Sequence, residues 1–262
     1  MTIPVRPGAA RPAGRPAGPD PLAPLLDLPG VREAADAARA GIDRLLAHRL
    51  MRNRSAEVST ESALRGARAS AALDGVDVPL ADLRAGSVDD PVVQGSLRVS
   101  VALGSMVDTW SRAPGQVLAR LHVLAAADLA DRADLGRPAP HAGPRLTGLF
   151  QLVTGTSTVP AVLVAGLAHG ELAALAPFGT ADGVVARAAG RLTVIGRGLD
   201  PKAVSVPEVG FAELGAEEYR ARLAGYASGG PEGVAAWLVH CCRATELGAR
   251  EGLAIAEAIL RG

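Results

Sequence analysis

Apolar residues recur at intervals of three and four along almost the whole chain, which is the spacing of one face of an α-helix. Proline, glycine, aspartate and serine interrupt these runs and mark where helices start and stop. Proline stands in the first turn of several runs, where its missing N–H is tolerated. The pattern predicts an all-α protein with helices at 31–50, 60–73, 91–110, 114–127, 144–153, 160–175, 183–195, 216–226 and 231–260.

Residues 29–262 contain no repeat of fixed period and no obvious linker, so we expect a single helical domain there. Residues 1–28 are rich in proline, glycine, alanine and arginine and lack the apolar stretch of a signal peptide. We therefore predict a disordered leader over 1–28. The most apolar segment, 159–178, is interrupted by Pro177 and carries His169 and Glu171, which favours a buried helix over a membrane span.

The charges balance, with 27 Lys+Arg against 27 Asp+Glu, and aromatic residues make up 3% of the chain. A neutral chain with few aromatic side chains is a poor candidate for binding nucleic acid. Cys241 and Cys242 are adjacent and cannot easily pair with each other, which favours a reducing, cytoplasmic setting. Abundant alanine, glycine and arginine, with Lys202 as the only lysine, indicate a GC-rich bacterial genome.

A loop of small residues joins two of the expected helices, at 176–187. Its sequence is Ala176-Pro177-Phe178-Gly179-Thr180-Ala181-Asp182-Gly183-Val184-Val185-Ala186-Arg187. The N–H groups at the start of the second helix form a generic anion site. The plain alternative is an interhelical turn in which Phe178 is packed as a plug and Arg187 is solvated.

This loop resembles the motif of the Fic (Fido) family, His-Pro-Phe-x-[Asp/Glu]-Gly-Asn-[Gly/Lys]-Arg-x-x-Arg. Pro177, Phe178, Gly183 and Arg187 match in register. Segments before and after the motif also resemble the family, so the likeness spans roughly residues 60–260. It implies a Fic-like helical bundle and, in active members, transfer of AMP or another phosphate-bearing group to a hydroxyl of a target protein.

A second segment, Ser70-Ala71-Ala72-Leu73-Asp74-Gly75, resembles the inhibitory motif [Ser/Thr]-x-x-x-Glu-[Gly/Asn] of family members whose inhibitory helix precedes the core. Here aspartate stands in place of glutamate, within an expected helix at about 60–75. The same residues would also suit an ordinary helix end with Gly75 as its cap.

The residues that the chemistry needs are replaced. Ala176 stands where the family has the histidine base, and Thr180 where it has the Asp/Glu that holds a metal. Asp182 replaces the asparagine and Val184 the first arginine, so the nucleotide-binding remnant is Asp182, Gly183 and Arg187. We expect no intact catalytic residue, no metal site and no bound cofactor.

The resemblance places Asp74 and Arg187 at the two positions that pair in inhibited family members. We therefore expect an ion pair that holds the inhibitory helix, with Ser70, Asp74 and Gly75 as its motif, on the former nucleotide site. The alternative is two unrelated surface charges.

Three functions remain open. The first is a degenerate Fic-domain protein, a pseudoenzyme that serves as a regulatory or binding module for a protein partner. The second is a divergent nucleotidyl (AMP) transferase with relocated residues, which would use ATP and Mg²⁺. The third is a purely structural helical interaction protein. None calls for nucleic acid or a membrane, and the oligomeric state is left open.

Overall fold

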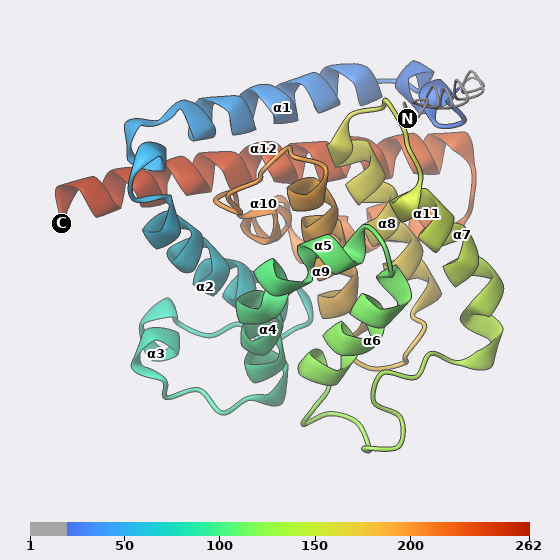
Figure 1. Ribbon diagram of the computed structural model, residues 1–262, viewed down its shortest axis with the longest axis horizontal. Coiled ribbons are helices and arrows are strands. Elements are labelled where there is room, and N and C mark those ends of the chain that lie inside the picture. The colour runs from blue at the N-terminus through green and yellow to red at the C-terminus, as the bar shows by residue number, and fades with distance from the viewer. Residues whose placement is uncertain (1–19) are drawn as a thin grey trace, which may run out of the picture.

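The computed structural model describes residues 20–262, which form α-helices joined by turns and short 3-10 helices (Figure 1). No strand occurs in this range, so the predicted all-α class is confirmed. The α-helices are α1 (Val31–Ala47), α2 (Ser55–Leu73), α3 (Leu80–Ala85), α4 (Pro91–Ala102), α5 (Val107–Trp110), α6 (Pro114–Ala125), α7 (Gly143–Thr154), α8 (Ala161–Leu175), α9 (Asp182–Gly196), α10 (Pro207–Leu214), α11 (Ala216–Ala227) and α12 (Pro231–Arg261).

The expected leader differs from the structure in its last part. Residues 1–19 lie outside the described residues, but residues 20–28 are ordered and include the 3-10 helix η1 (Ala23–Asp27), which contacts α1. Leu25 and Leu26 pack against an apolar cluster. The Asp20 carboxylate accepts a hydrogen bond from the Ser157 hydroxyl at 2.8 Å. The boundary placed at residue 28 is therefore wrong, because leucines between the prolines anchor this segment.

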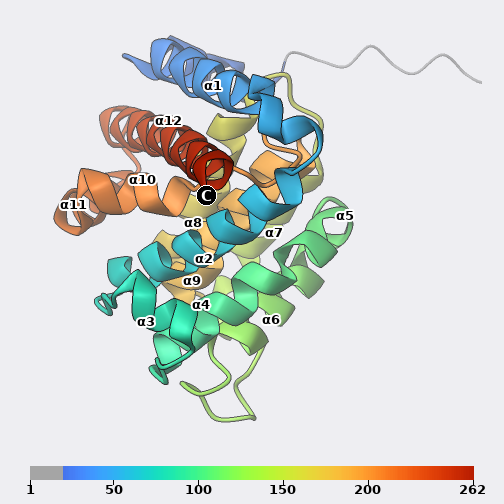
Figure 2. The ribbon, with the colours of Figure 1, turned by 90° about the vertical axis from the view of Figure 1, so that its left-hand side faces the viewer.

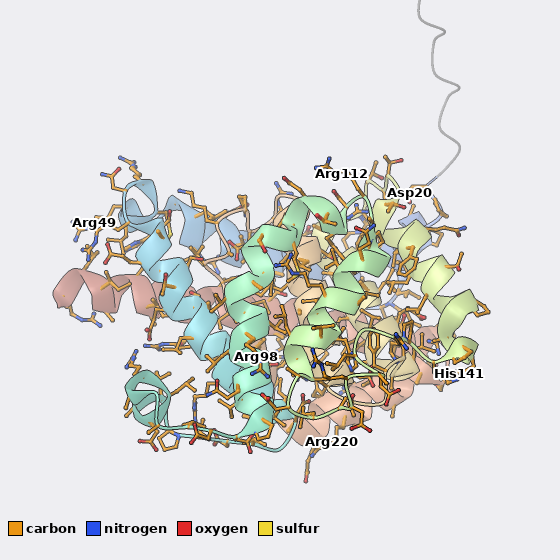
Figure 3. All side chains as sticks on the ribbon, turned by 60° about the horizontal axis from the view of Figure 1, so that its bottom comes forward. Asp20, Arg49, Arg98, Arg112, His141 and Arg220 are labelled. Carbon is orange, nitrogen blue, oxygen red and sulfur yellow. The ribbon has the colours of Figure 1, made fainter. Side chains whose placement is uncertain are left out.

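The helices pack around a central pair, α8 and α9. α8 and α9 pack along each other, and α1 and α12 run side by side across the top of the molecule (Figure 1). Figure 2 shows α1 and α12 at one end of the molecule and α3, α4 and α6 at the other. Arg49, Arg112 and Arg220 project from three separate edges, so these positive charges are dispersed (Figure 3).

The α9 helix lies at the centre of the fold. Every residue from Val184 to Val194 is buried. A helix that is covered on all sides is normally apolar throughout, yet Arg187 and Arg191 are only 4% and 6% exposed. Buried charges are costly unless they are paired, so the partners of these two arginines decide what packs on α9.

The structure adds two helices that the sequence pattern did not predict, α3 and α10. Both are eight residues or shorter, which is too short for a helical repeat to stand out. The helix expected at 91–110 is broken by the 3-10 helix η3 (Leu103–Met106), which contains Gly104. Within residues 20–262, no helix is long and apolar enough to cross a membrane.

Candidate functional site

Two alanines of the loop between α8 and α9 adopt the left-handed backbone conformation that usually requires glycine. Ala176, which caps the end of α8, has φ 46°, and Ala181, just before α9, has φ 51°. Side chains with a Cβ rarely adopt this conformation, which costs about 1–2 kcal/mol per residue. Strained backbone of this kind persists where the surrounding structure holds it in place.

Two hydrogen bonds hold this loop: one lies within it, and the other comes from the segment before α7. The Phe178 N–H donates to Asp182 Oδ1 at 3.0 Å, and the Ala139 N–H donates to the Pro177 carbonyl at 2.8 Å. Burial raises the pKa of the Asp182 carboxyl, partly offset by the backbone N–H groups of Phe178 and Gly179. Asp182 therefore stabilises the conformation of the loop.

His122, on α6, faces the loop. Its ring stacks on Phe178 with centroids 4.2 Å apart, and Nε2 lies 3.0 Å from the Thr180 hydroxyl. The Gly136 N–H donates to Nδ1 at 2.9 Å, so the neutral imidazole carries its proton on Nε2 and donates it to Thr180. Burial lowers the pKa of His122, which favours this neutral form. In this arrangement His122 is a donor and not a base toward Thr180.

Arg187 lies between α9 and α2. Its Nε donates to the Ser70 hydroxyl at 2.8 Å, and its Nη2 donates to the Ser70 carbonyl at 3.0 Å and to Asp74 Oδ2 at 2.7 Å. The side chain is 2% exposed, against 27% for Asp74. Burial works against the charge of Arg187, but the Asp74 carboxylate and Tyr219 together outweigh it and raise the pKa of Arg187. The ion pair expected between Asp74 and Arg187 is present, and Arg187 is not solvated.

The Asp74 carboxylate also reaches the first turn of α9. A Cβ added at Gly183 would lie 2.5 Å from Asp74 Oδ1, which no real contact permits. Only glycine at position 183 allows this approach. Gly75 has φ 96°, and the Val76 N–H donates to the Ala71 carbonyl at 2.9 Å, which closes the end of α2 as a Schellman motif.

One nitrogen of this network lacks a partner. Arg187 Nη1 is buried and makes no hydrogen bond within residues 20–262. It lies 3.1 Å from the place that a Cβ on Gly183 would take, next to the start of α9.

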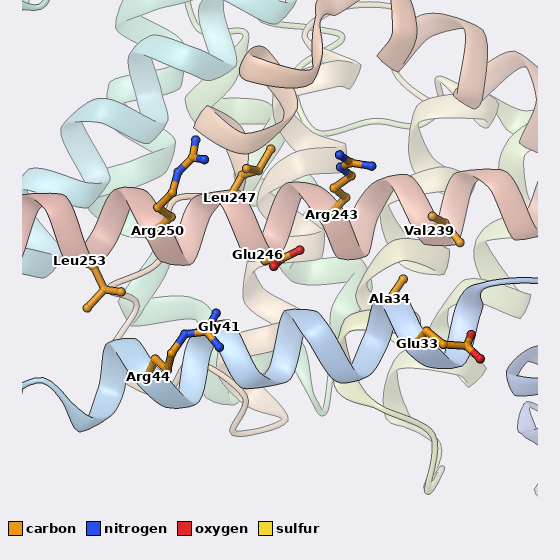
Figure 4. A pocket seen from close by; sticks show the side chains of 10 residues that line it. All are labelled: Glu33, Ala34, Gly41, Arg44, Val239, Arg243, Glu246, Leu247, Arg250 and Leu253. Atoms are coloured by element: carbon orange, nitrogen blue, oxygen red, sulfur yellow. The ribbon is translucent and has the colours of Figure 1, made fainter.

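The space left at this site is small. A hollow of 170 Å³ is lined by Asp74, Val92, Ala125, Leu129, Ala181, Asp182, Gly183 and Val184. Small-molecule sites usually measure about 300–1,000 Å³. The 610 Å³ groove between α1 and α12, lined in part by Arg44, Arg243, Glu246 and Arg250, is larger but contains no motif residue (Figure 4). Within residues 20–262, no three His, Cys, Asp or Glu side chains gather closely enough to hold a metal ion.

The structure thus brings Ser70, Asp74, Gly183 and Arg187 together, and it turns Thr180 away toward His122. His169, two turns before Ala176, is 3% exposed and hydrogen-bonds the Tyr219 hydroxyl at 2.7 Å, as expected of a packed histidine. The contact of His122 with the loop was not predicted. It joins residues 58 positions apart, and no local pattern marks it.

The sequence matches no protein-family model and no curated protein. Its fold is similar to that of a Fic family protein from Desulfovibrio desulfuricans G20, with a TM-score of 0.69 and 18% identity over 86% of this chain and 74% of that chain. It is similar to Fic-1 from C. elegans, with a TM-score of 0.68 and 16% identity over 87% of this chain and 73% of that chain. The chain therefore adopts the helical fold of Fic proteins.

Proposed function

We propose that this Fic-fold protein has lost nucleotide transfer and acts as a regulatory or binding module for a protein partner. One observation carries the proposal. The Asp74 carboxylate lies beside Gly183 and on Arg187, at the start of α9. The motif resemblance assigns this place to nucleotide phosphates, which the N–H groups of a helix start would bind. A carboxylate of the same chain fills it here and repels a second anion.

The residues around the loop do not supply the missing base. Ala176 has no proton-accepting group. Burial lowers the pKa of His169 well below its ordinary value, and its Nε2 is engaged with Tyr219. His122 donates its ring N–H to the Thr180 hydroxyl in a hydrogen bond and does not accept a proton from it. Loss of a general base alone removes about 10²–10⁴ in rate.

A magnesium nucleotide does not fit this site either. Mg²⁺ is usually held through one or two carboxylates together with substrate phosphates. Asp182 accepts the Phe178 N–H, Asp74 is bound to Arg187, and the Thr180 hydroxyl faces His122. With the Asp74 side chain lining it, the hollow of 170 Å³ is too small for a nucleotide. We accordingly propose that the protein works without ATP, Mg²⁺ or another cofactor.

Calorimetric titration with ATP and Mg²⁺ tests the blocked site. We expect no binding by the wild-type protein, because Asp74 holds the anion position. Asp74→Ala removes the competing carboxylate and should allow weak binding, and Asp74→Ala with Arg187→Ala should abolish it again. Tight binding by the wild type that Arg187→Ala removes would contradict the proposal.

Incubation with labelled ATP, CTP, GTP and UTP and a cell lysate separates the two main functions. The pseudoenzyme should leave no label on any protein. Transfer that is lost in Asp182→Ala would favour the divergent nucleotidyl (AMP) transferase instead.

The setting that we propose is the cytoplasm of a bacterium, with a protein and not nucleic acid or a membrane as the partner. The balanced charge and the buried, unpaired cysteines support it. Cross-linking in cells followed by mass spectrometry should recover a protein partner, and sedimentation would measure the oligomeric state.

A further inference from the structure

The inner face of α2 makes a regular line of contacts with α9, with α10 and with the segment that joins them. Three α2 residues, Ser62, Gly66 and Ser70, together with Asp74 just past the end of the helix, face the centre of the fold at intervals of four. The partners on α9 move from Arg191 at Gly66 to Arg187 at Ser70 and Gly183 at Asp74, so α2 and α9 run in opposite directions. The pairs are Ser62 with Val204, Gly66 with Arg191 and Glu208, Ser70 with Arg187, and Asp74 with Gly183 and Arg187.

At Gly66 the backbone of α2 comes close to the side chains of Arg191 and Glu208. A Cβ at position 66 would lie 3.0 Å from Arg191 Nη1 and 3.2 Å from Glu208 Oε2, which is too tight unless these atoms move.

These two side chains are held firmly. Arg191 Nη1 and Glu208 Oε2 are 3.0 Å apart, and the side chains are 6% and 10% exposed. Arg191 Nη2 also donates to the Ala203 carbonyl at 3.1 Å. A buried, hydrogen-bonded ion pair gives way only at a high cost, so it forms a rigid support under α2.

We propose that Gly66 and the Arg191–Glu208 pair are positioning residues that hold Asp74 over the start of α9. This inference rests on the proposed function, in which Asp74 blocks the anion site. Gly66 and Asp74 are eight residues apart on one helix, or about 12 Å. A helix moves as a stiff body, so a side chain at position 66 shifts α2 and loosens the contact of the Asp74 carboxylate with Arg187 and Gly183.

A double-mutant cycle on unfolding tests the coupling without any ligand. In the wild-type background, Asp74→Asn should lower the folding equilibrium constant by about tenfold, because it leaves buried Arg187 without its countercharge. In the Gly66→Ala background, the same change should lower the folding equilibrium constant by about threefold or less, since the contact is already weakened. Gly66→Leu should reduce the effect of Asp74→Asn on the folding equilibrium constant still further. If it does not fold, Gly66→Ala alone decides.

Gly148→Ala provides the matched control, because a Cβ there has no atom within 4 Å and the residue lies in α7. It should leave the effect of Asp74→Asn unchanged. Sites this far apart normally act additively to within about twofold. Additivity of Gly66→Ala with Asp74→Asn would overturn the inference.

Titration with inorganic pyrophosphate separates this inference from the proposed function. Gly66→Ala should gain pyrophosphate binding as Asp74→Ala does. If the cycle shows coupling but neither variant binds, the anion-site part of the proposed function fails and the positioning role stands. If Asp74→Ala binds while Gly66→Ala neither binds nor couples, the positioning role fails and the proposed function stands.

Discussion

At the scale of single residues, the motif loop keeps its shape by means that do not depend on catalysis. Asp182 ties the loop to the Phe178 N–H, and His122 holds Thr180 and Phe178. Ala176 and Ala181 adopt left-handed backbone conformations that favour glycine. The loop therefore carries both backbone strain and a half-buried carboxylate, and each can be measured separately.

Ala176→Gly should stabilise the protein by about 1 kcal/mol, because it relieves the left-handed strain at an exposed helix end. Ala221→Gly, at an exposed position within α11, should instead destabilise it by about 0.5–1 kcal/mol. Urea unfolding of both variants measures the difference. Equal destabilisation by the two changes would show that position 176 is unstrained.

Asp182→Asn should stabilise the folded state at about pH 7 and do so less at about pH 4. Burial raises the folded-state pKa of Asp182, so its carboxyl favours folding below the unfolded-state pKa, and that stability is lost as pH rises through the folded-state pKa. Asparagine keeps the acceptor for the Phe178 N–H and carries no charge. Urea unfolding across this pH range measures the gap between wild type and variant in the free energy of unfolding. A gap that grows as the pH falls would contradict the assignment.

At the scale of helices, close approaches define the packing. The α10 backbone meets α12 at Gly210, where a Cβ would lie 1.9 Å from the Ala244 carbonyl oxygen. Backbone atoms cannot turn aside as a side chain can, so two whole helices would have to separate. Contacts of this kind join segments distant in sequence.

Gly210→Ala should destabilise the protein by about 1–3 kcal/mol through overpacking between α10 and α12. Gly148→Ala has open space around it and should raise stability slightly through helix propensity. Thermal unfolding of the two variants, followed by circular dichroism, checks the contrast. A harmless Gly210→Ala would mean that α10 does not dock as described.

The sequence predicted the long helices well because their apolar faces repeat over many turns. It missed α3 and α10, which are short, and the break at η3 between α4 and α5. In the site, the Asp74–Arg187 pair was predicted because the resemblance supplied the register of both motifs. The Thr180–His122 contact and the support under Gly66 join distant segments, so they depend on tertiary packing that no local pattern encodes.

At the scale of the whole molecule, the helix that carries Gly183 and Arg187 is also the centre of the core. Val184 to Val194 are buried, and α9 contacts α2, α4, α5, α6 and α8. Packing alone therefore requires this helix, whatever chemistry its start supports. The presence of this fold therefore does not by itself imply an activity.

Acid should weaken the whole fold through its buried histidines. Burial lowers the pKa of His169 well below its ordinary value, and burial lowers that of His240 to about 4. A histidine with a lowered folded-state pKa favours folding above the unfolded-state pKa of about 6.5, and this stability is lost as the pH falls. The free energy of unfolding should therefore drop between about pH 7 and pH 5. His169→Gln should make that dependence shallower, and an unchanged slope in calorimetry would count against the assignment.

Because Asp74 and Arg187 belong to one chain, their contact does not depend on protein concentration. A tethered group acts at an effective concentration of ~mM or more, whereas a free anion competes only at its own concentration. Dilution does not weaken this contact, because every copy of the chain carries both Asp74 and Arg187. On the proposed function, an effector that displaces α2 would act more efficiently than a free anion that competes with Asp74, so the surface of α2 is where we would look for a regulator.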